Sequence, residues 1–378
     1  MNQKEIGELR RRFQPDKTAI SRIYGCYVNS QKEIVSYIDE SLGVMPQEEA
    51  EQYLSFLKKA LSGTPGKNLI DIVFSNQQVM DSDEHRALMA LRDSGLKDQE
   101  QRNAFFQRII DCLDMGESNY LILMAHDAYD VPYRGKDGER QDDAGDRVFR
   151  YVVCAICPVK DGKLELGYFS GENEFHNCLA KQIVGAPELG FVFPAFDNRA
   201  ANIYNALLYC RKPDELHQEF IDGIFHIEAP MSATEQQAAF QTALADALEE
   251  KCSLDVVQSV HERLRERIEE HKESKDPEPL TVSSKDLGAI LTDCGVSEEL
   301  AASFRERYAE QFGEGAVLRP ENLIDSRRFE VKTGDATLNV DPARSYLIET
   351  RVIDGRKYSN RRYILRLKEH REASFLLG

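Results

Sequence analysis

Two histidines and two aspartates have the clearest capacity for metal-assisted chemistry. His126, Asp127 and Asp130 come directly after a predicted strand, 119–125. Polar side chains just beyond a strand often hold ligands, and imidazole and carboxylate groups bind divalent metals. Together with His176 they could form the metal site of a hydrolase. The alternative is a solvated connection, because the residues that follow carry charges of both signs.

Three other motifs lack part of what their chemistry requires. The loop 63–68 resembles half of a phosphate-binding loop, but it has no Ser or Thr after Lys67 and precedes its strand instead of following it. Cys154 and Cys157 form the one CxxC pair, yet positions three apart in a strand face opposite sides, and zinc would need two more ligands. Ser170 stands one place too late for a nucleophile elbow. The sequence names no reaction, and we expect no cofactor.

One compact group of basic side chains near the start of the chain could contact nucleic acid. The same predicted helix carries an apolar stripe, so its arginines could equally be the solvated side of that helix. A second basic group, Arg263, Arg265 and Arg267, lies on a later predicted helix. The members of the first group are Arg10, Arg11, Arg12, Lys17 and Arg22.

The chain as a whole is acidic. Its 65 acidic and 48 basic residues give a formal charge of −17, which opposes adhesion to nucleic-acid phosphates or anionic lipid. Residues 1–12 are charged and lack the apolar core of a signal peptide, and no stretch approaches the roughly 18 apolar residues of a membrane span. The eight cysteines are mostly single, as reduced thiols are. We therefore expect a cytoplasmic protein with no membrane partner.

These side chains must be positioned by an α+β fold. A chain of 378 residues is long enough for two or three domains. The first 230 residues alternate helical patterns with β-rich runs, which predicts a central mixed or antiparallel sheet flanked by helices. The run 202–210 would also suit a short helix. The predicted strands are 20–28, 33–39, 69–74, 119–125, 148–157, 163–169, 188–196 and 202–210.

The second part of the chain has a helical period from Ser232 onward. Residues 231–275 predict a helical hairpin, and the polar, proline-containing segment 273–279 predicts a boundary. Residues 280–378 predict a small α+β module of two helices and short strands. The predicted domains are thus 1–230, 231–275 and 280–378.

Several stretches together resemble a known family. The resemblance is to a bacterial family catalogued as domain-of-unknown-function family 4317, and it covers nearly the whole chain. That family brings no assigned activity or catalytic residues. Residues 359–362 depart from its tail, so the resemblance does not define the last strand. The stretches are 9–13, 22–29, 125–138, 187–191 and 349–355.

The order of elements is also similar to that of bacterial nucleoid-associated proteins. The local parallels are 220–225, leading into the helix capped at Ser232, and the run from Val282 through 329–331. This resemblance implies a non-enzymatic, dimeric protein that binds DNA at the nucleoid. The alternatives are a metal-dependent hydrolase built on the histidine and aspartates above, and a scaffold that binds another protein.

Overall fold

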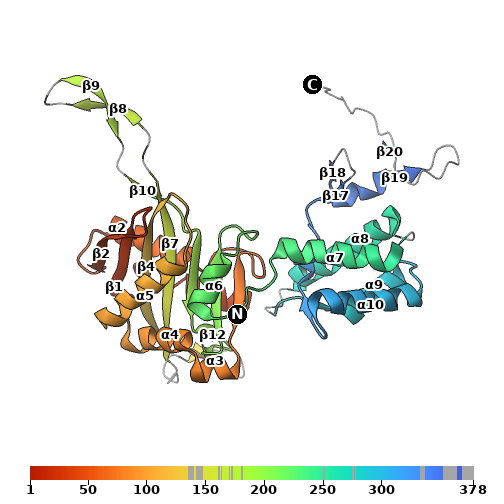
Figure 1. Ribbon diagram of the computed structural model, residues 1–378, viewed down its shortest axis with the longest axis horizontal. Coiled ribbons are helices and arrows are strands. Elements are labelled where there is room, and N and C mark those ends of the chain that lie inside the picture. The colour runs from red at the N-terminus through yellow and green to blue at the C-terminus, as the bar shows by residue number, and fades with distance from the viewer. Residues whose placement is uncertain are drawn as a thin grey trace. The chain divides into compact units, whose positions relative to one another are not determined.

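The protein forms two compact units, Met1–Ser232 and Ala233–Gly378, each with its own apolar core (Figure 1). The predicted α+β class is confirmed. Among the described helices, none combines the length and apolar character needed to cross a membrane. The computed structural model describes residues 1–134, 140–141, 148–160, 162, 164–169, 171, 173–179, 182–249, 252–274, 276, 278–332, 337–351 and 364–367.

Unit 1 is built on one antiparallel sheet, in the order β2-β1-β4-β7-β11-β14-β3, with the short β10 beside β7. The two longest strands, β4 and β7, pair at its centre over twelve residue pairs from Asn119↔Val159 to Asp130↔Val148. The strands are β1 Arg22–Val28, β2 Ile34–Ser41, β3 Leu69–Val73, β4 Asn119–Asp130, β7 Val148–Lys160, β10 Ile183–Val184, β11 Leu189–Phe193 and β14 Asn205–Cys210. In the run 202–210, which would also suit a helix, residues 205–210 form the strand β14.

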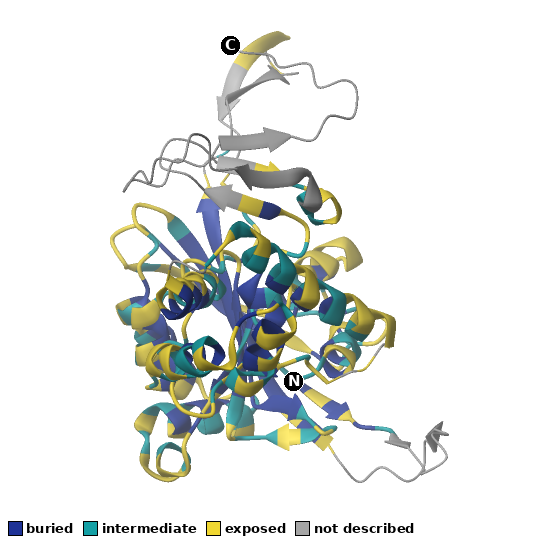
Figure 2. Ribbon diagram, turned by 90° about the vertical axis from the view of Figure 1, so that its right-hand side faces the viewer, coloured by how far each residue is buried: buried dark blue, intermediate teal, exposed yellow. Residues whose placement is uncertain are grey.

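Helices cover both faces of this sheet, which is why its central strands are apolar on both sides. In Figure 2 the dark blue of buried residues runs along strands, and the yellow of exposed residues marks the outer sides of helices. On one face, α3 to α6 pack against residues such as Met124 and Val152. On the other, α1 and α2 pack against Leu123 and Val153. The helices are α1 Gln3–Arg10, α2 Gln47–Lys59, α3 Asn76–Asp81, α4 Asp83–Ser94, α5 Gln99–Cys112 and α6 Gln218–Phe225.

The burial pattern of the sheet changes at one end of β4 and β7. Up to Ala125, the side chains of β4 are buried on both faces, whereas beyond it Asp127 and Tyr129 stay buried while Ala128 and Asp130 are exposed. β7 repeats the alternation over its first residues. Because α4 ends at Ser94, with Gly95 as its left-handed cap, one face of the sheet is left partly uncovered here.

Three hairpins add to the sheet. The β8–β9 hairpin extends beyond the end of the sheet that carries β10 (Figure 1). In the β12–β13 hairpin, Asn198 and Arg199 form a two-residue turn with φ of 47° and 57°. The paired strands are β5 Tyr133–Arg134 with β6 Arg140–Gln141, β8 Leu164–Phe169 with β9 Glu174–Leu179, and β12 Ala195–Asp197 with β13 Ala200–Asn202.

Unit 2 is a helical assembly with short strands. The predicted hairpin 231–275 and the predicted module 280–378 both contribute side chains to its core, so packing groups them together. Its helices are α7 Ala233–Leu248, α8 Leu254–Ser274, α9 Ser284–Asp293, α10 Glu298–Phe312, α11 Pro320–Leu323 and the 3-10 helix η2 Pro342–Leu347. Its strands are β15 Val282–Ser283, β16 Val317–Leu318, β17 Phe329–Lys332, β18 Thr337–Val340, β19 Ile348–Arg351 and β20 Ile364–Leu367.

We predict that Gly25→Ala lowers the free energy of unfolding of unit 1. A Cβ at Gly25 would meet the backbone oxygen of Ile122 on the neighbouring strand, and such overpacking costs about 1–3 kcal/mol. Chemical denaturation of the full chain measures the loss. The matched control is Gly43→Ala, where an added Cβ meets nothing within 4 Å. Equal stability of the two variants would contradict the prediction.

Candidate functional site

The side chains predicted to hold a metal do not come together. The prediction ended the strand at Ala125, but β4 continues to Asp130, so His126 and Asp127 point to opposite faces. Asp130 is exposed at the end of the strand, and His176 lies on β9, with its Nε2 3.4 Å from Glu174 Oε2. Among the residues that the structure describes, no three His, Cys, Asp or Glu side chains form a group that could hold a metal.

The other motifs have structural environments. Cys154 and Cys157 are fully buried in the two cores on opposite faces of the sheet. Burial raises the pKa of Cys157 to about 12, so its thiol stays protonated. The loop 63–68 joins α2 to β3, and its Asn68 donates to the backbone oxygen of Cys210 at 3.1 Å. Ser170 and the segment 359–362 lie outside the described residues.

Asp127 is the centre of a buried ion network. Arg12 donates from Nε to Oδ2 at 2.7 Å and from Nη2 to Oδ1 at 3.1 Å. The hydroxyl of Tyr151 donates to Oδ2 at 2.8 Å, and the guanidinium carbon of Arg12 lies 4.5 Å from the centre of the Tyr129 ring. A fully buried carboxylate is tolerated only with such bidentate, hydrogen-bonded pairing.

The network continues from the sheet through α1 to the β12–β13 hairpin. The hydroxyl of Tyr129 donates to Glu8 on α1. The other carboxylate oxygen of Glu8 lies 2.6 Å from Nη1 of Arg199, at the tip of the hairpin. Arg199 also donates from Nη2 to the backbone oxygen of Pro132 at 3.0 Å. Side chains from distant parts of the sequence thereby fix the position of the hairpin.

Two tyrosines and one arginine of this network keep their protons at neutral pH, because their pKa values are raised. Burial raises the pKa of Tyr151 well above its ordinary value, and the charge of Asp127 adds to this. Burial and the hydrogen bond with Glu8 raise the pKa of Tyr129 to about 12. For Arg12, burial opposes the charge, but the hydrogen bond and charge of Asp127 outweigh it and raise the pKa. The network is therefore suited to holding structure, not to proton transfer.

The predicted nucleic-acid residues differ in their contacts, and three of them have partners within the chain. Arg12 is committed to Asp127, and Arg22 forms an exposed ion pair with Asp39 at 2.6 Å. Lys17 donates to the side chain of Gln14 at 2.9 Å. Arg10 and Arg11 are exposed.

The arginines of α8 are partly neutralised within their own helix. Arg263 lies 3.1 Å from Glu266, and Arg265 lies 3.0 Å from Glu269. Such pairs, three and four positions apart, are the usual contacts along a solvated helix face. These contacts reduce the charge that α8 can offer to a nucleic acid.

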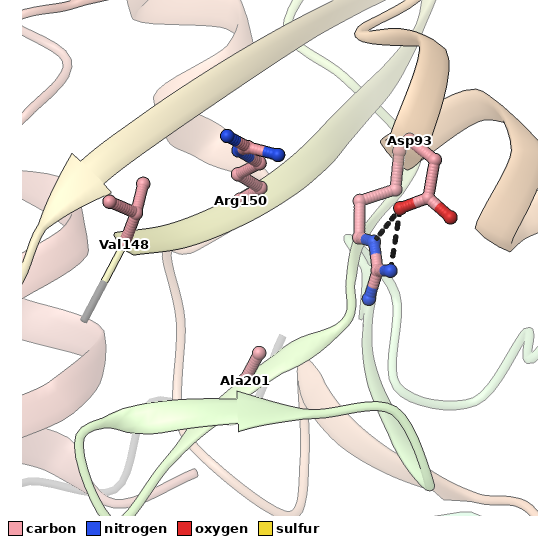
Figure 3. A pocket seen from close by; sticks show the side chains of 5 residues that line it. Asp93, Val148, Arg150 and Ala201 are labelled. Carbon is pink, nitrogen blue, oxygen red and sulfur yellow. Dashed lines mark hydrogen bonds and ion pairs between the residues drawn. The ribbon is translucent and has the colours of Figure 1, made fainter. Parts of the chain in front are cut away.

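A pocket lies where β4 and β7 lose their helical cover, on the face opposite Asp127. It has a volume of about 370 Å³. Figure 3 shows Val148 and Arg150 on the same side of β7, with Ala201 coming from β13. The lining residues are Arg92, Asp93, Val148, Arg150 and Ala201.

The two arginines of this pocket differ in their partners. Nη2 of Arg92 lies 2.6 Å from Oδ1 of the adjacent Asp93, so this pair is neutralised within the pocket wall (Figure 3). The guanidinium of Arg150 is exposed and has no acidic partner in the described part of the chain. Sequence reasoning missed this residue, although a lone arginine inside the apolar run 148–157 was an available signal.

His126 lies on the same face of the sheet, diagonally from Arg150 in the β4–β7 ladder. Burial lowers its pKa, and Arg150, Lys97 and Arg92 lower it further, while Asp127 acts in the opposite direction. The Nε2 atom is buried without a hydrogen-bond partner among the described residues. The imidazole is therefore neutral at neutral pH. Of the charged groups on this face, Arg92 is paired with Asp93, and the exposed Asp130 lies diagonally from Arg150.

Comparison with known families decides the family of this protein. The chain matches the family described as a domain of unknown function (DUF4317) over residues 1–368. It belongs to that family. The match includes every residue of the ion network and of the pocket, and it confirms the family resemblance drawn from the sequence. A comparison with curated proteins gives no match. The similarity to nucleoid-associated proteins stays a prediction.

We predict that Asp127→Asn strongly destabilises unit 1. The substitution leaves the Arg12 charge without its partner, and breaking a buried pair costs about 3–5 kcal/mol. The matched control is Asp83→Asn, which breaks an exposed pair with Arg86 and costs about 0–1 kcal/mol. Denaturant titration of both variants measures the difference. Losses of similar size would show that the buried pair has no special role.

We predict that His126 makes the stability of unit 1 fall on acidification. Its folded pKa is lowered, so the unfolded chain binds a proton first, and stability decreases as pH falls below about 6.5. The measurement is the free energy of unfolding at several pH values between about 7.5 and about 5, the interval in which histidine side chains change their charge. His126→Gln should reduce this dependence, and the remainder should include His217 of the same unit, whose pKa is also lowered by burial. His176→Gln, on an exposed side chain, is the control substitution. A dependence that survives His126→Gln intact would refute the assignment.

Proposed function

We propose that this protein is a binding protein that takes up a small anion in the pocket between α4, β7 and β13. The observation that carries the proposal is the guanidinium of Arg150, which is exposed in a pocket and has no acidic partner among the described residues. Arginine presents five N–H donors in a planar fork that matches carboxylate and phosphate oxygens. Arg92, already paired with Asp93, supplies a second guanidinium nearby.

The local charge supports an anion. Two arginines and one aspartate line the pocket, and Lys97 acts on the adjacent His126. This positive region belongs to a chain with a formal charge of −17. In such a background, a pocket with low-dielectric walls concentrates the positive potential where a ligand binds.

The size of the pocket supports a small molecule. Its volume of about 370 Å³ is near the lower end of the range for small-molecule sites, which is about 300–1,000 Å³. The proposal favours binding over hydrolysis because Asp127 faces away from His126 and Asp130 on β4, and His176 lies on the separate strand β9.

A nucleoid-associated role is the alternative that the element order suggests. It would depend mainly on the exposed Arg10 and Arg11, since Arg12 is held by Asp127, Arg22 is paired with Asp39 and Lys17 contacts Gln14. No contact in the described part of the chain favours it over the pocket. Homodimer formation, a protein-binding scaffold and a location at the nucleoid stay predictions from the sequence.

We predict that inorganic sulfate and phosphate bind the full chain at low ionic strength, and that Arg150→Ala weakens this binding about 10- to 100-fold. That range corresponds to the loss of hydrogen bonds to a charged group, about 1.5–3 kcal/mol. Isothermal titration calorimetry measures both affinities. Arg11→Ala, which removes an exposed arginine outside the pocket, serves as the matched control and should leave anion affinity unchanged.

The same preparations distinguish the nucleic-acid alternative. Binding of a short DNA duplex that falls steeply with salt, is lost in an Arg10→Ala, Arg11→Ala double variant and is unaffected by Arg150→Ala would favour DNA. Absence of sulfate and phosphate binding at millimolar concentrations would overturn the anion proposal.

A further inference from the structure

We infer that the ligand of this pocket is an organic acid with a compact apolar group, whose anionic head binds Arg150 and whose hydrocarbon part covers Val148 and Ala201. This inference rests on the proposed function and names its ligand class. It starts from the two apolar residues in the pocket lining, which a site for an inorganic anion alone would not need.

Val148 is exposed, whereas the next residue in the strand, Phe149, is buried. The first residues of β7 alternate, so Phe149 and Tyr151 are buried while Val148 and Arg150 project from the other face. The side chain of Val148 is 47% exposed, and Ala201 on β13 is exposed as well. The pocket thus has exposed apolar surface beside the guanidinium of Arg150.

The spacing of these groups sets the size of the ligand. Val148 and Arg150 are two positions apart on one face of a strand, which places them about 7 Å apart at roughly 3.3 Å per residue. A carboxylate or phosphate on Arg150 with a few carbons attached reaches Val148. Figure 3 shows both side chains on one side of β7, with Ala201 on the separate hairpin.

The acidic residue of the pocket does not call for a cationic group on the ligand. Asp93 receives two hydrogen-bond donors from Arg92, with Nε at 2.8 Å and Nη2 at 2.6 Å. Both contacts end on Oδ1 of Asp93, so this carboxylate is paired with the adjacent Arg92. The guanidinium of Arg150 and the apolar surface of Val148 and Ala201 are then the groups that fit an organic acid.

The position of Ala201 depends on the ion network on the other face of the sheet. Ala201 follows the hairpin tip, where Arg199 binds Glu8 and the backbone oxygen of Pro132. Because the hairpin is held from outside the pocket, its wall is in place before a ligand arrives. A preformed apolar wall lowers the ordering cost of binding.

The test is a series of straight-chain monocarboxylates from acetate to octanoate, titrated into the full chain. The charge is constant along the series, so we expect the dissociation constant to fall about fourfold per added CH₂, from about 0.8 kcal/mol each, until the pocket is filled. Arg150→Ala should weaken the binding of every carboxylate by a similar factor. Alcohols of the same chain length carry no charge, so their affinity for the unsubstituted protein should equal their affinity for Arg150→Ala.

Val148→Thr isolates the apolar contact. Threonine is close to valine in shape but carries a hydroxyl, so the dependence on chain length should flatten while acetate affinity stays the same. Val73→Thr is the matched control, since Val73 is an exposed valine on the edge strand β3, outside the pocket. It should leave the whole series unchanged, and circular dichroism should show that both variants are folded.

Each outcome decides between the two proposals. Equal affinity for all chain lengths, with sulfate binding that still depends on Arg150, would overturn the organic-acid inference and leave the anion site standing. A chain-length dependence that Val148→Thr does not change would overturn it too. Failure of sulfate and of every carboxylate to bind would overturn both proposals.

Discussion

The fold of unit 1 depends on the pairing of one buried carboxylate with one arginine. Asp127 is fully buried under the sheet, and burying an unpaired charge there would cost several kcal/mol. Arg12 meets that cost with two hydrogen bonds, and in doing so it fixes the chain after α1 against β4 and β7. Glu8 then lies where it can bind Arg199. The ion pair and the contact of Glu8 with Arg199 therefore link the β12–β13 hairpin, and with it one wall of the pocket, to β4.

The pleat of β4 and β7 places the ion network on one face of the sheet and the pocket residues on the other. Asp127 and Tyr151 face the network, while His126 and Arg150, their neighbours in sequence, face the opposite side. Because paired residues in an antiparallel ladder share a face, the two strands build two chemically different surfaces from alternate positions. One face is dry and has fixed charges. The other is exposed because α4 ends at Ser94, and it carries a guanidinium that no described acidic residue neutralises.

Short-range patterns in the sequence predicted much of the fold, but they did not predict the pocket. Capping boxes form at Asn2 with Glu5 and at Ser283 with Asp286, where the two partners are three positions apart in the sequence. The predicted end of β4 at Ala125 was wrong. The polar residues after it indicated a loop, but Asp127 stays in the strand because it pairs with Arg12, 115 positions away in the sequence. The pocket draws on α4, β7 and β13, which no spacing in the sequence connects. Only the arginine within the apolar run 148–157 was visible in advance.

The acidity of the chain and the proposed anion site are compatible, because they act over different distances. At physiological ionic strength, exposed charges are screened beyond about 8 Å, so a small ligand inside the pocket responds mainly to Arg150 and its neighbours. A long polyanion such as DNA would instead contact a wide surface, where the net charge is −17 and several arginines are already ion-paired. If the proposed function holds, the charge distribution that admits a small acid would disfavour a nucleic acid without any residue dedicated to that discrimination.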